Sequence, residues 1–391
     1  MSSEWGGRLA QLLEADADNA AIVGIDIADP RHELHRTEFV RLDMDQTLLA
    51  RIVTAASIDT VVDTRLTPDL AGTRNLLLAS SGARSPVRKL IFKSSAHCYG
   101  SEHDDPAFFT EDMARQRPAR TPLERAILAA ERAVADFAAA NPQATVTVLR
   151  FADAVGGVER GDHLALLGLP VIPAVLGFDP RFQFIHEEDA IGVLAHAVLH
   201  DLPGSYNAAA DGVLALSEVA ALLGKPLLPI LPPWGTVFAA AQLRRLRLPV
   251  PVDALRQLRY GRGLDNRRLK ASGYLFSYTT REAVLGLRAQ QRLRPLLGTG
   301  SDSYRYEREV EEFLRWSPSV RSAAHPSDGA PTTEAPTAVT TYDHLSEGEL
   351  IGLMSSLETP ALHRLRAFEA SHRARPGVLE ALERMLARRS A

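Results

Sequence analysis

One short segment of the sequence carries four side chains that could take part in chemistry. In LIFKSSAHCYG, an apolar run leads into Ser94, Ser95, His97 and Tyr99. A serine hydroxyl can bond the oxygen of a substrate, and an imidazole, with an unperturbed pKa of about 6.5, can exchange protons near neutral pH. If the apolar run is a strand of an open parallel sheet, the segment lies at its carboxyl end, where such sheets bind ligands. For His97 the alternative, a polar residue at the mouth of a loop, stays open.

A second group of residues could bind a nucleotide. In SSEWGGRLAQLL, Gly6 stands at the start of a predicted helix, where a glycine lets the helix pack close to a sheet and free N–H groups can meet a pyrophosphate. Asp26 ends the apolar run AAIVGID, where a carboxylate can accept hydrogen bonds from an adenosine ribose and disfavour a 2′-phosphate. Asp43, at the end of VRLD, could similarly face the adenine. A plain capping turn at Gly6 and a helix-capping or turn role for Asp26 stay open as alternatives.

The elements that must position these groups alternate along residues 1–155. The runs AAIVGID, TEFVRLD, IDTVVDT, VRKLIFKSS and ATVTVLRF are predicted strands, with helical patterns between several of them. Continuous apolar runs suit strands that are covered on both faces, and alternation with helices favours a parallel, doubly wound sheet. We therefore predict an α/β fold with its ligand site at the carboxyl edge of that sheet.

The rest of the chain changes in composition. Residues 156–318 have more proline and longer loops, and we predict a smaller substrate-binding part that is partly interleaved with the sheet. Residues 319–343 are rich in Ser, Thr, Ala and Pro and predict a disordered linker. Residues 344–391 recover helical periodicity, with capping-box spacing of Ser346 and Glu349, and predict a small helical tail.

Composition narrows the class of protein. Hydrophobic residues make up 46% and charged residues 24%, as in soluble globular proteins. The net charge of −4 does not predict a broad basic surface for nucleic acid. The sequence has no run of 18 or more apolar residues, so we predict no membrane span. The single cysteine, Cys98, excludes an internal disulfide. Together with the lack of a signal-peptide pattern, it leads us to expect a cytoplasmic protein.

Several segments together resemble a known family. KSSAHCYG, TVTVLRFADAVG, RFQFIHEEDAIGVLAHAV, GSYNAAADG and LDNRRLKASGYLFSYTTREAV follow one another at spacings similar to those of extended short-chain dehydrogenases/reductases. The resemblance covers roughly residues 5–290 and is specific to the NAD-dependent nucleotide-sugar epimerase/dehydratase branch. It implies a Rossmann domain that holds NAD, with NADP less favoured, and a smaller domain that closes over a nucleotide-sugar. The resemblance also implies that a hydride passes from the sugar to the cofactor and then returns to the sugar.

The resemblance also implies roles for particular residues. Ser95 matches the catalytic serine, and His97 falls where dehydratases tend to carry an acid–base residue. Ser94 joins Gly6, Asp26 and Asp43 as a predicted cofactor-binding residue. The acidic segment HEED at 186–189 matches a helix start in the family rather than a metal site, and we expect no bound metal.

The sequence departs from the family in two respects. The family's general base is a tyrosine followed four residues later by a lysine, and none of the eight tyrosines here has that lysine. Thr121 and Arg125 stand at the matching positions, and a threonine hydroxyl ionises too weakly to replace a tuned phenol. The first strand and first glycines of the cofactor turn are also absent from the sequence, so we expect the sheet to lack its central strand.

The leading prediction is an NAD(P)-dependent epimerase/dehydratase-like protein that acts on a nucleotide-sugar. The alternative is a catalytically silent nucleotide-binding or scaffold protein of the same fold, whose helical tail binds a partner. The sequence also leaves open whether the protein forms a homodimer.

Overall fold

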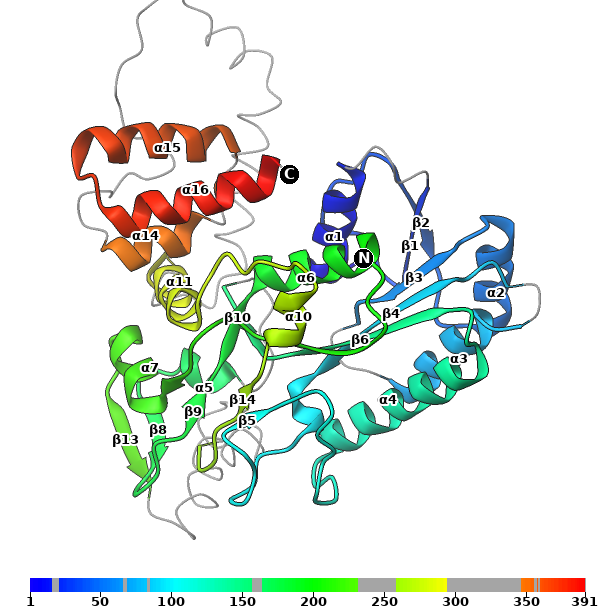
Figure 1. The fold of residues 1–391 in the computed structure, drawn as a ribbon, viewed down its shortest axis with the longest axis horizontal. Helices are drawn as coiled ribbons and strands as arrows, with labels where there is room; N and C mark the ends of the chain where they lie inside the picture. Colours follow the sequence, from blue (N-terminus) through cyan, green and yellow to red (C-terminus); the bar gives the residue numbers. More distant parts are fainter. Residues whose placement is uncertain are drawn as a thin grey trace, which may run out of the picture. The chain divides into compact units, whose positions relative to one another are not determined.

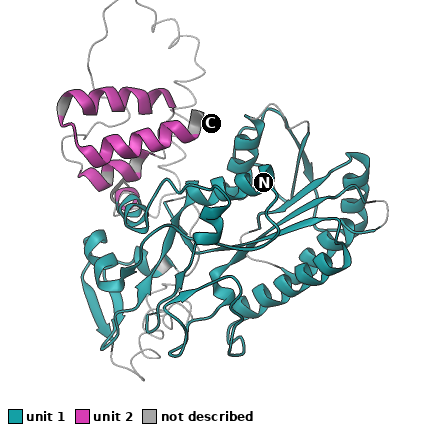
Figure 2. Cartoon of the chain, in the orientation of Figure 1, with its two compact units in different colours: residues 1–288 teal, residues 289–391 magenta. Residues whose placement is uncertain are grey.

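The computed structural model describes most of the chain as two compact units, which are Met1–Arg288 and Ala289–Ala391 (Figure 2). The described residues are 1–15, 21–65, 69–82, 85–156, 164–230, 258–293, 346–354, 357 and 359–390. The predicted linker at 319–343 lies outside the described residues. The predicted boundary at residue 155 falls inside the first unit and stays a prediction.

Two parallel sheets form the framework of the first unit (Figure 1). The larger has the strand order β11-β6-β4-β3, from β3 (Thr60–Asp63), β4 (Lys89–Ser95), β6 (Thr145–Phe151) and β11 (Gly204–Ala208). In the smaller sheet, β1 (Ile22–Asp26) pairs with β2 (Thr37–Arg41). Each of the five predicted strand runs contains one of these strands. Among the described residues, β1 and β2 form a sheet of their own, which is separate from the larger one.

Helices cover both faces of the larger sheet. One side is covered by α2 (Gln46–Ala55), α3 (Leu70–Ala79) and α4 (Pro122–Ala140), whose apolar side chains form a buried cluster with Leu90 and Phe92 of β4. The other side is covered by α1 (Glu4–Glu14) and α6 (Glu187–Leu199), which pack with Ile91 of β4 and Leu149 of β6. The predicted doubly wound α/β architecture is therefore confirmed.

Side-chain caps fix where these helices begin. Ser3 caps α1, Asp45 caps α2, Asp69 caps α3 and Thr121 caps α4, each by accepting a hydrogen bond from a backbone N–H of the first turn. The HEED segment begins α6, as the family resemblance implies, with His186 as its N-cap residue. Capping therefore sets the end of each helix that lies nearest the carboxyl edge of the sheet.

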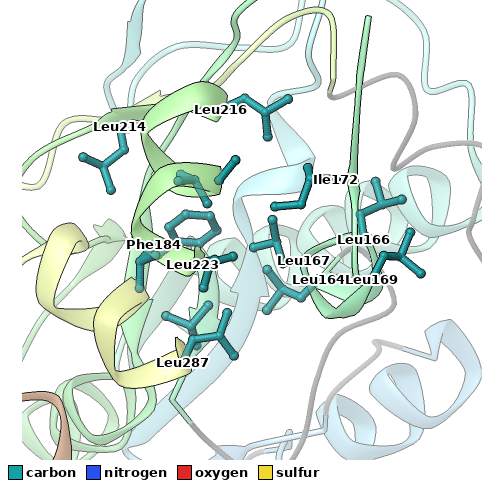
Figure 3. Close-up of a cluster of buried hydrophobic side chains, with 14 of the residues drawn as sticks. Leu164, Leu166, Leu167, Leu169, Ile172, Phe184, Leu214, Leu216, Leu223 and Leu287 are labelled. Carbon is teal, nitrogen blue, oxygen red and sulfur yellow. The ribbon is translucent and has the colours of Figure 1, made fainter. Parts of the chain in front are cut away.

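The chain beyond residue 156 builds a second core. Besides α6 and β11, this part of the chain contains α5 (Ala165–Gly168), β8 (Ile172–Val175), β9 (Arg181–Phe182), β10 (Phe184–His186), β12 (Leu214–Ala215), α7 (Leu216–Leu223), β13 (Leu227–Ile230), β14 (Gly263–Leu264), α10 (Arg267–Ala271) and α11 (Thr280–Leu293). Figure 3 shows its buried side chains converging from α5, β10, α7 and α11. β10 pairs with β7 (Asp153–Val155), and β14 pairs with β5 (Phe108–Phe109). These pairings connect the second core to segments that follow the strands of the larger sheet.

The second unit contains the predicted helical tail. Its helices are α14 (Glu347–Leu353), α15 (Thr359–His372) and α16 (Pro376–Ser390). Its buried core includes Leu350, Leu362, Leu365, Leu382 and Met385. Fully buried Glu369 accepts two hydrogen bonds from the Arg375 guanidinium, at 2.9 and 2.8 Å, so a paired charge joins the end of α15 to the start of α16. None of the helices within the described ranges has the length and apolarity that a membrane crossing requires.

Glu14 provides a test of how α1 is anchored. Its carboxylate accepts backbone N–H bonds from His35, Arg36 and Thr37. Burial acts to raise its pKa, but these bonds and the Thr37 hydroxyl lower the pKa from 4.5 to about 2. The carboxylate therefore stabilises the fold above about pH 4.5, and this contribution is lost as the pH falls towards 2. We expect Glu14→Gln to lower the free energy of unfolding at neutral pH by about 1 kcal/mol, a value discounted for solvent screening.

Urea unfolding at neutral and acidic pH checks this expectation. The exposed Glu38→Gln is the matched control and should change stability by less than about 0.5 kcal/mol. A Glu14→Gln deficit that stays constant from neutral pH down to about pH 2 would contradict the assignment.

Candidate functional site

The side chains of β4 alternate between the two faces of the sheet. Ile91 packs on the face that α1 and α6 cover, and the two-residue period of a strand puts Lys93 and Ser95 on that same face. Ser94 has the opposite orientation and donates its hydroxyl hydrogen bond to Glu131 of α4. Of the two adjacent serines, Ser95 therefore shares a face with α1, whereas Ser94, the predicted cofactor residue, is engaged on the face covered by α4.

Ser95 also shapes the turn that follows the strand. Its hydroxyl oxygen accepts a hydrogen bond from the backbone N–H of His97 at 3.4 Å, which caps the short helix η1 (Ala96–Cys98). The cap turns the chain so that the His97 side chain is buried, with 6% of its surface exposed. The structure therefore brings the two predicted catalytic residues together at the carboxyl end of β4.

Two residues that the sequence analysis missed complete this group. His97 Nε2 lies 3.3 Å from Asp153 Oδ1, and His97 Nδ1 lies 3.5 Å from an Nη atom of Arg262. A guanidinium can only donate, so Nδ1 is the acceptor, and in the neutral imidazole Nε2 carries the proton and donates it to Asp153. Arg262 also donates to the carbonyl oxygens of Ala96 and Gly100, at 2.8 and 3.1 Å.

The group borders a small pocket at the carboxyl ends of β4 and β6, and the space of about 350 Å³ there includes open solvent at its mouth. Its lining includes Ala96, Asp153, Phe182, Gln183, Tyr260 and Arg262. Burial lowers the pKa of the Arg262 guanidinium and the charge of Asp153 opposes that effect, but a guanidinium stays charged at neutral pH. The pocket thus offers one carboxylate, one guanidinium, an amide and two aromatic rings to a polar ligand.

A partly buried polar network supports the site from the α4 side. Arg150 binds Glu131 through two hydrogen bonds, Nε–Oε1 at 3.1 Å and Nη2–Oε2 at 2.8 Å, and donates to the Tyr99 hydroxyl at 2.8 Å. Tyr99 in turn donates to Asn207 of β11 at 2.8 Å. Burial raises the pKa of Tyr99, so its phenol is neutral at pH 7 and serves as a structural link. Burial likewise raises the pKa of the Cys98 thiol to about 12, which leaves little thiolate for nucleophilic chemistry.

Thr121 and Arg125 do not lie in the pocket. The Thr121 hydroxyl accepts from the backbone N–H of Glu124 at 3.0 Å and forms a capping box, while Arg125 is exposed. The residues of α4 in the apolar cluster with Ala96, Cys98 and Tyr99 are instead Leu123, Ile127 and Leu128. A local signal for the cap was present in the sequence, because Thr-Pro-x-Glu is a helix start with a capping box and proline in the first turn.

Two of the predicted nucleotide-binding residues, Gly6 and Asp26, lie at the start of α1 and the end of β1, while Asp43 follows β2. A Cβ added to Gly6 would come within 2.8 Å of the Met1 amine and 3.2 Å of the Thr64 hydroxyl, so the close approach requires glycine. The Asp26 carboxylate accepts from the Met1 amine and from the backbone and hydroxyl of Ser2, at 2.8, 2.7 and 2.9 Å. Asp43 is exposed, and its carboxylate accepts from the backbone N–H of Met44 at 2.7 Å.

Comparison with known proteins identifies the family. The model of the NAD dependent epimerase/dehydratase family matches residues 5–209. Uncharacterised proteins of Mycobacterium tuberculosis and Mycobacterium bovis are 30% identical over 299 residues, which cover 71% of this chain and 79% of theirs. A UDP-glucose 4-epimerase of Neisseria gonorrhoeae is 37% identical over 89 residues, 22% of this chain and 25% of that protein.

Solved structures share the fold at low identity. A UDP-glucuronic acid 4-epimerase from Bacillus cereus in complex with NAD superposes with a TM-score of 0.55 at 15% identity, over 74% of this chain and 97% of that one. A dTDP-glucose 4,6-dehydratase double mutant from Streptomyces venezuelae, with NAD bound, gives a TM-score of 0.55 at 15% identity, over 75% of this chain and 95% of that one. The resemblance inferred from the sequence is thus confirmed, and the chain belongs to the NAD-dependent epimerase/dehydratase family.

Proposed function

We propose that the protein binds NAD and converts a nucleotide-sugar by transient hydride transfer. The observation that carries the proposal is the contact of His97 with Asp153 and Arg262, two residues that line one pocket at the carboxyl ends of neighbouring parallel strands. Ser95 caps the turn that carries His97. Support comes from the family to which the chain belongs and from its likeness to a UDP-glucose 4-epimerase.

The residues around α1 fit the adenosine half of NAD. Gly6 allows the close approach that a dinucleotide turn needs, and α1 has an N-terminus capped by Ser3. Asp26 already accepts hydrogen bonds from N–H and O–H donors, and ribose hydroxyls are donors of the same kind. A carboxylate there would repel a 2′-phosphate, so we propose NAD rather than NADP. When bound, NAD supplies the acceptor and donor of the hydride.

Residues of this chain other than a tyrosine can accept the proton that the substrate hydroxyl loses. We assign the Ser95 hydroxyl to bonding the substrate oxygen that is oxidised. Asp153, which lines the pocket, would take the proton from that oxygen at its carboxylate. His97 orients this carboxylate through its Nε2–H, and Arg262 fixes the His97 tautomer by donating to Nδ1. Compared with the sequence-based hypothesis, the proton acceptor becomes Asp153, and His97 becomes a positioning residue.

One observation favours a second candidate function. The face of α4 that packs on η1 offers the apolar side chains Leu123 and Ile127, and the phenol of Tyr99 is committed to Arg150 and Asn207. A family member with no phenol base could bind nucleotide without turnover. In this alternative, residues 344–391 would bind a protein partner; that partner and a homodimer stay predictions.

The experiment that tests the proposal combines binding with product analysis. The full chain is titrated with NADH by calorimetry and then incubated with NAD⁺ and a panel of UDP- and dTDP-sugars. We expect NADH to bind and one nucleotide-sugar to convert to an isomer or a dehydrated product, with no net accumulation of NADH. Binding without conversion of any sugar would favour the silent alternative, and a folded protein that does not bind NADH would overturn both.

A further inference from the structure

Lys93 occupies an unusual place for a lysine, near the carboxyl end of a strand whose central side chains are buried. Its ammonium lies 4.9 Å from the centre of the Trp5 ring and donates to the carbonyl oxygen of Arg65 at 3.2 Å. Trp5 belongs to the first turn of α1, and Arg65 follows β3. The cation is therefore held where α1, β3 and β4 meet, at the edge of the sheet where ligands of this fold bind.

The surroundings hold this cation in a defined position. Trp5 is 4% exposed, and its indole N–H donates to Glu187 of α6 at 2.9 Å, which fixes the plane of the ring. An ammonium over the face of a fixed indole is attracted by the ring's quadrupole. An ammonium has three N–H groups, so Lys93 can bind several acceptors at once, a ligand oxygen among them.

Two landmarks bracket the position of Lys93 along a bound dinucleotide. The diphosphate belongs at the N-terminus of α1, whose first turn contains Trp5. The reacting end belongs at Ser95, which is two residues beyond Lys93 on the same strand face, or about 7 Å along β4. The part of NAD that lies between its diphosphate and its nicotinamide is a ribose.

We infer that Lys93 binds the ribose on the nicotinamide side of NAD, an inference that rests on the proposed function. The ammonium donates to the ribose hydroxyls from β4, whereas the α4 side chains that pack in the apolar cluster after β4 are Leu123, Ile127 and Leu128. Lys93 would thus make this contact from a strand, two residues before Ser95 on the same face.

Three ligands and one matched control test this role by binding alone. Calorimetry compares NADH and ADP-ribose, which contain the second ribose, with ADP, which does not. Loss of one charge-assisted hydrogen bond should weaken NADH and ADP-ribose binding to Lys93→Met at least about tenfold and leave ADP binding within about twofold. Lys89→Met removes a lysine from the amino end of the same strand, where it pairs with Asp201, and should bind all three ligands like the wild type.

Each outcome bears on the inference. Equal binding of NADH by Lys93→Met and wild type would overturn it and leave the proposed function standing, whereas a wild type that binds none of the three would remove both. Weakening of ADP as much as of NADH would also overturn it, because the contact would then be to the diphosphate. Lys93→Arg, which keeps the charge and the donors, should recover part of the lost NADH affinity. If Lys93→Met does not fold, as judged by circular dichroism, Lys93→Gln replaces it.

Discussion

Replacing Asp153 with asparagine is expected to lower kcat by about 100- to 10,000-fold on the nucleotide-sugar that the wild type converts. The amide oxygen of asparagine can still accept the hydrogen bond from His97 Nε2, so the arrangement of His97 and Arg262 is retained. The amide cannot take a proton at neutral pH, however, and the step that Asp153 performs is lost. KM and NADH affinity should change little, because the substitution keeps the volume and the hydrogen bond.

Steady-state kinetics and NADH titration on the same preparation check this expectation. Asp179→Asn is the matched control, since this exposed carboxylate accepts from Ser217 at the start of α7 and does not line the pocket. Turnover of Asp153→Asn within about threefold of the wild type would exclude Asp153 as the proton acceptor. A rise in KM with unchanged kcat would mean that the carboxylate contributes to binding and not to chemistry.

The pairing at Asp153 also shows where sequence reasoning reaches its limit. Ser95 and His97 were found because both lie within one local pattern, an apolar strand that ends in polar residues. Asp153 and Arg262 are 56 and 165 positions from His97, and no local pattern records that separation. A partial signal existed for Asp153, which closely follows the run ATVTVLRF, because parallel strands that are neighbours end at the same edge.

Thr121 illustrates a different kind of error. Matching the family's tyrosine by position put it in the site, but its own neighbours, Pro122 and Glu124, favour a helix cap. The fold was easier to predict than the site, because the spacing of apolar residues that is typical of a strand or a helix repeats over many residues. Each repeat is further evidence for the element. Whether a side chain faces a pocket depends on one or two residues of register, which the periods alone do not determine. A shift of two residues on α4 separates Thr121 from Leu123, which packs behind the site.

The second large effect concerns stability, and we expect Arg150→Met to lower the free energy of unfolding by about 3–5 kcal/mol. Arg150 makes two hydrogen bonds to Glu131, and its guanidinium also lies 4.9 Å from the centre of the Tyr99 ring. Removing the guanidinium leaves the Glu131 carboxylate, with 12% of its side chain exposed, without its ionic partner. The cost arises from that uncompensated charge more than from the net value of the pair, which burial makes small.

This account predicts that a second substitution should recover much of the loss. In Glu131→Gln/Arg150→Met no ion is left unpaired, so the double variant should be more stable than Arg150→Met alone, by at least about 1 kcal/mol. Urea unfolding of the four proteins of the cycle measures the coupling. The exposed Arg125→Met, on the helix that carries Glu131, serves as the control, with an expected change below about 0.5 kcal/mol. Additive losses in the double variant would mean that Arg150 acts through its bonds to Tyr99 and to the carbonyl oxygen of Glu111, not through Glu131. In that outcome, the hydrogen bond that the Ser94 hydroxyl donates to Glu131 would stabilise that carboxylate in Arg150→Met without help from Arg150.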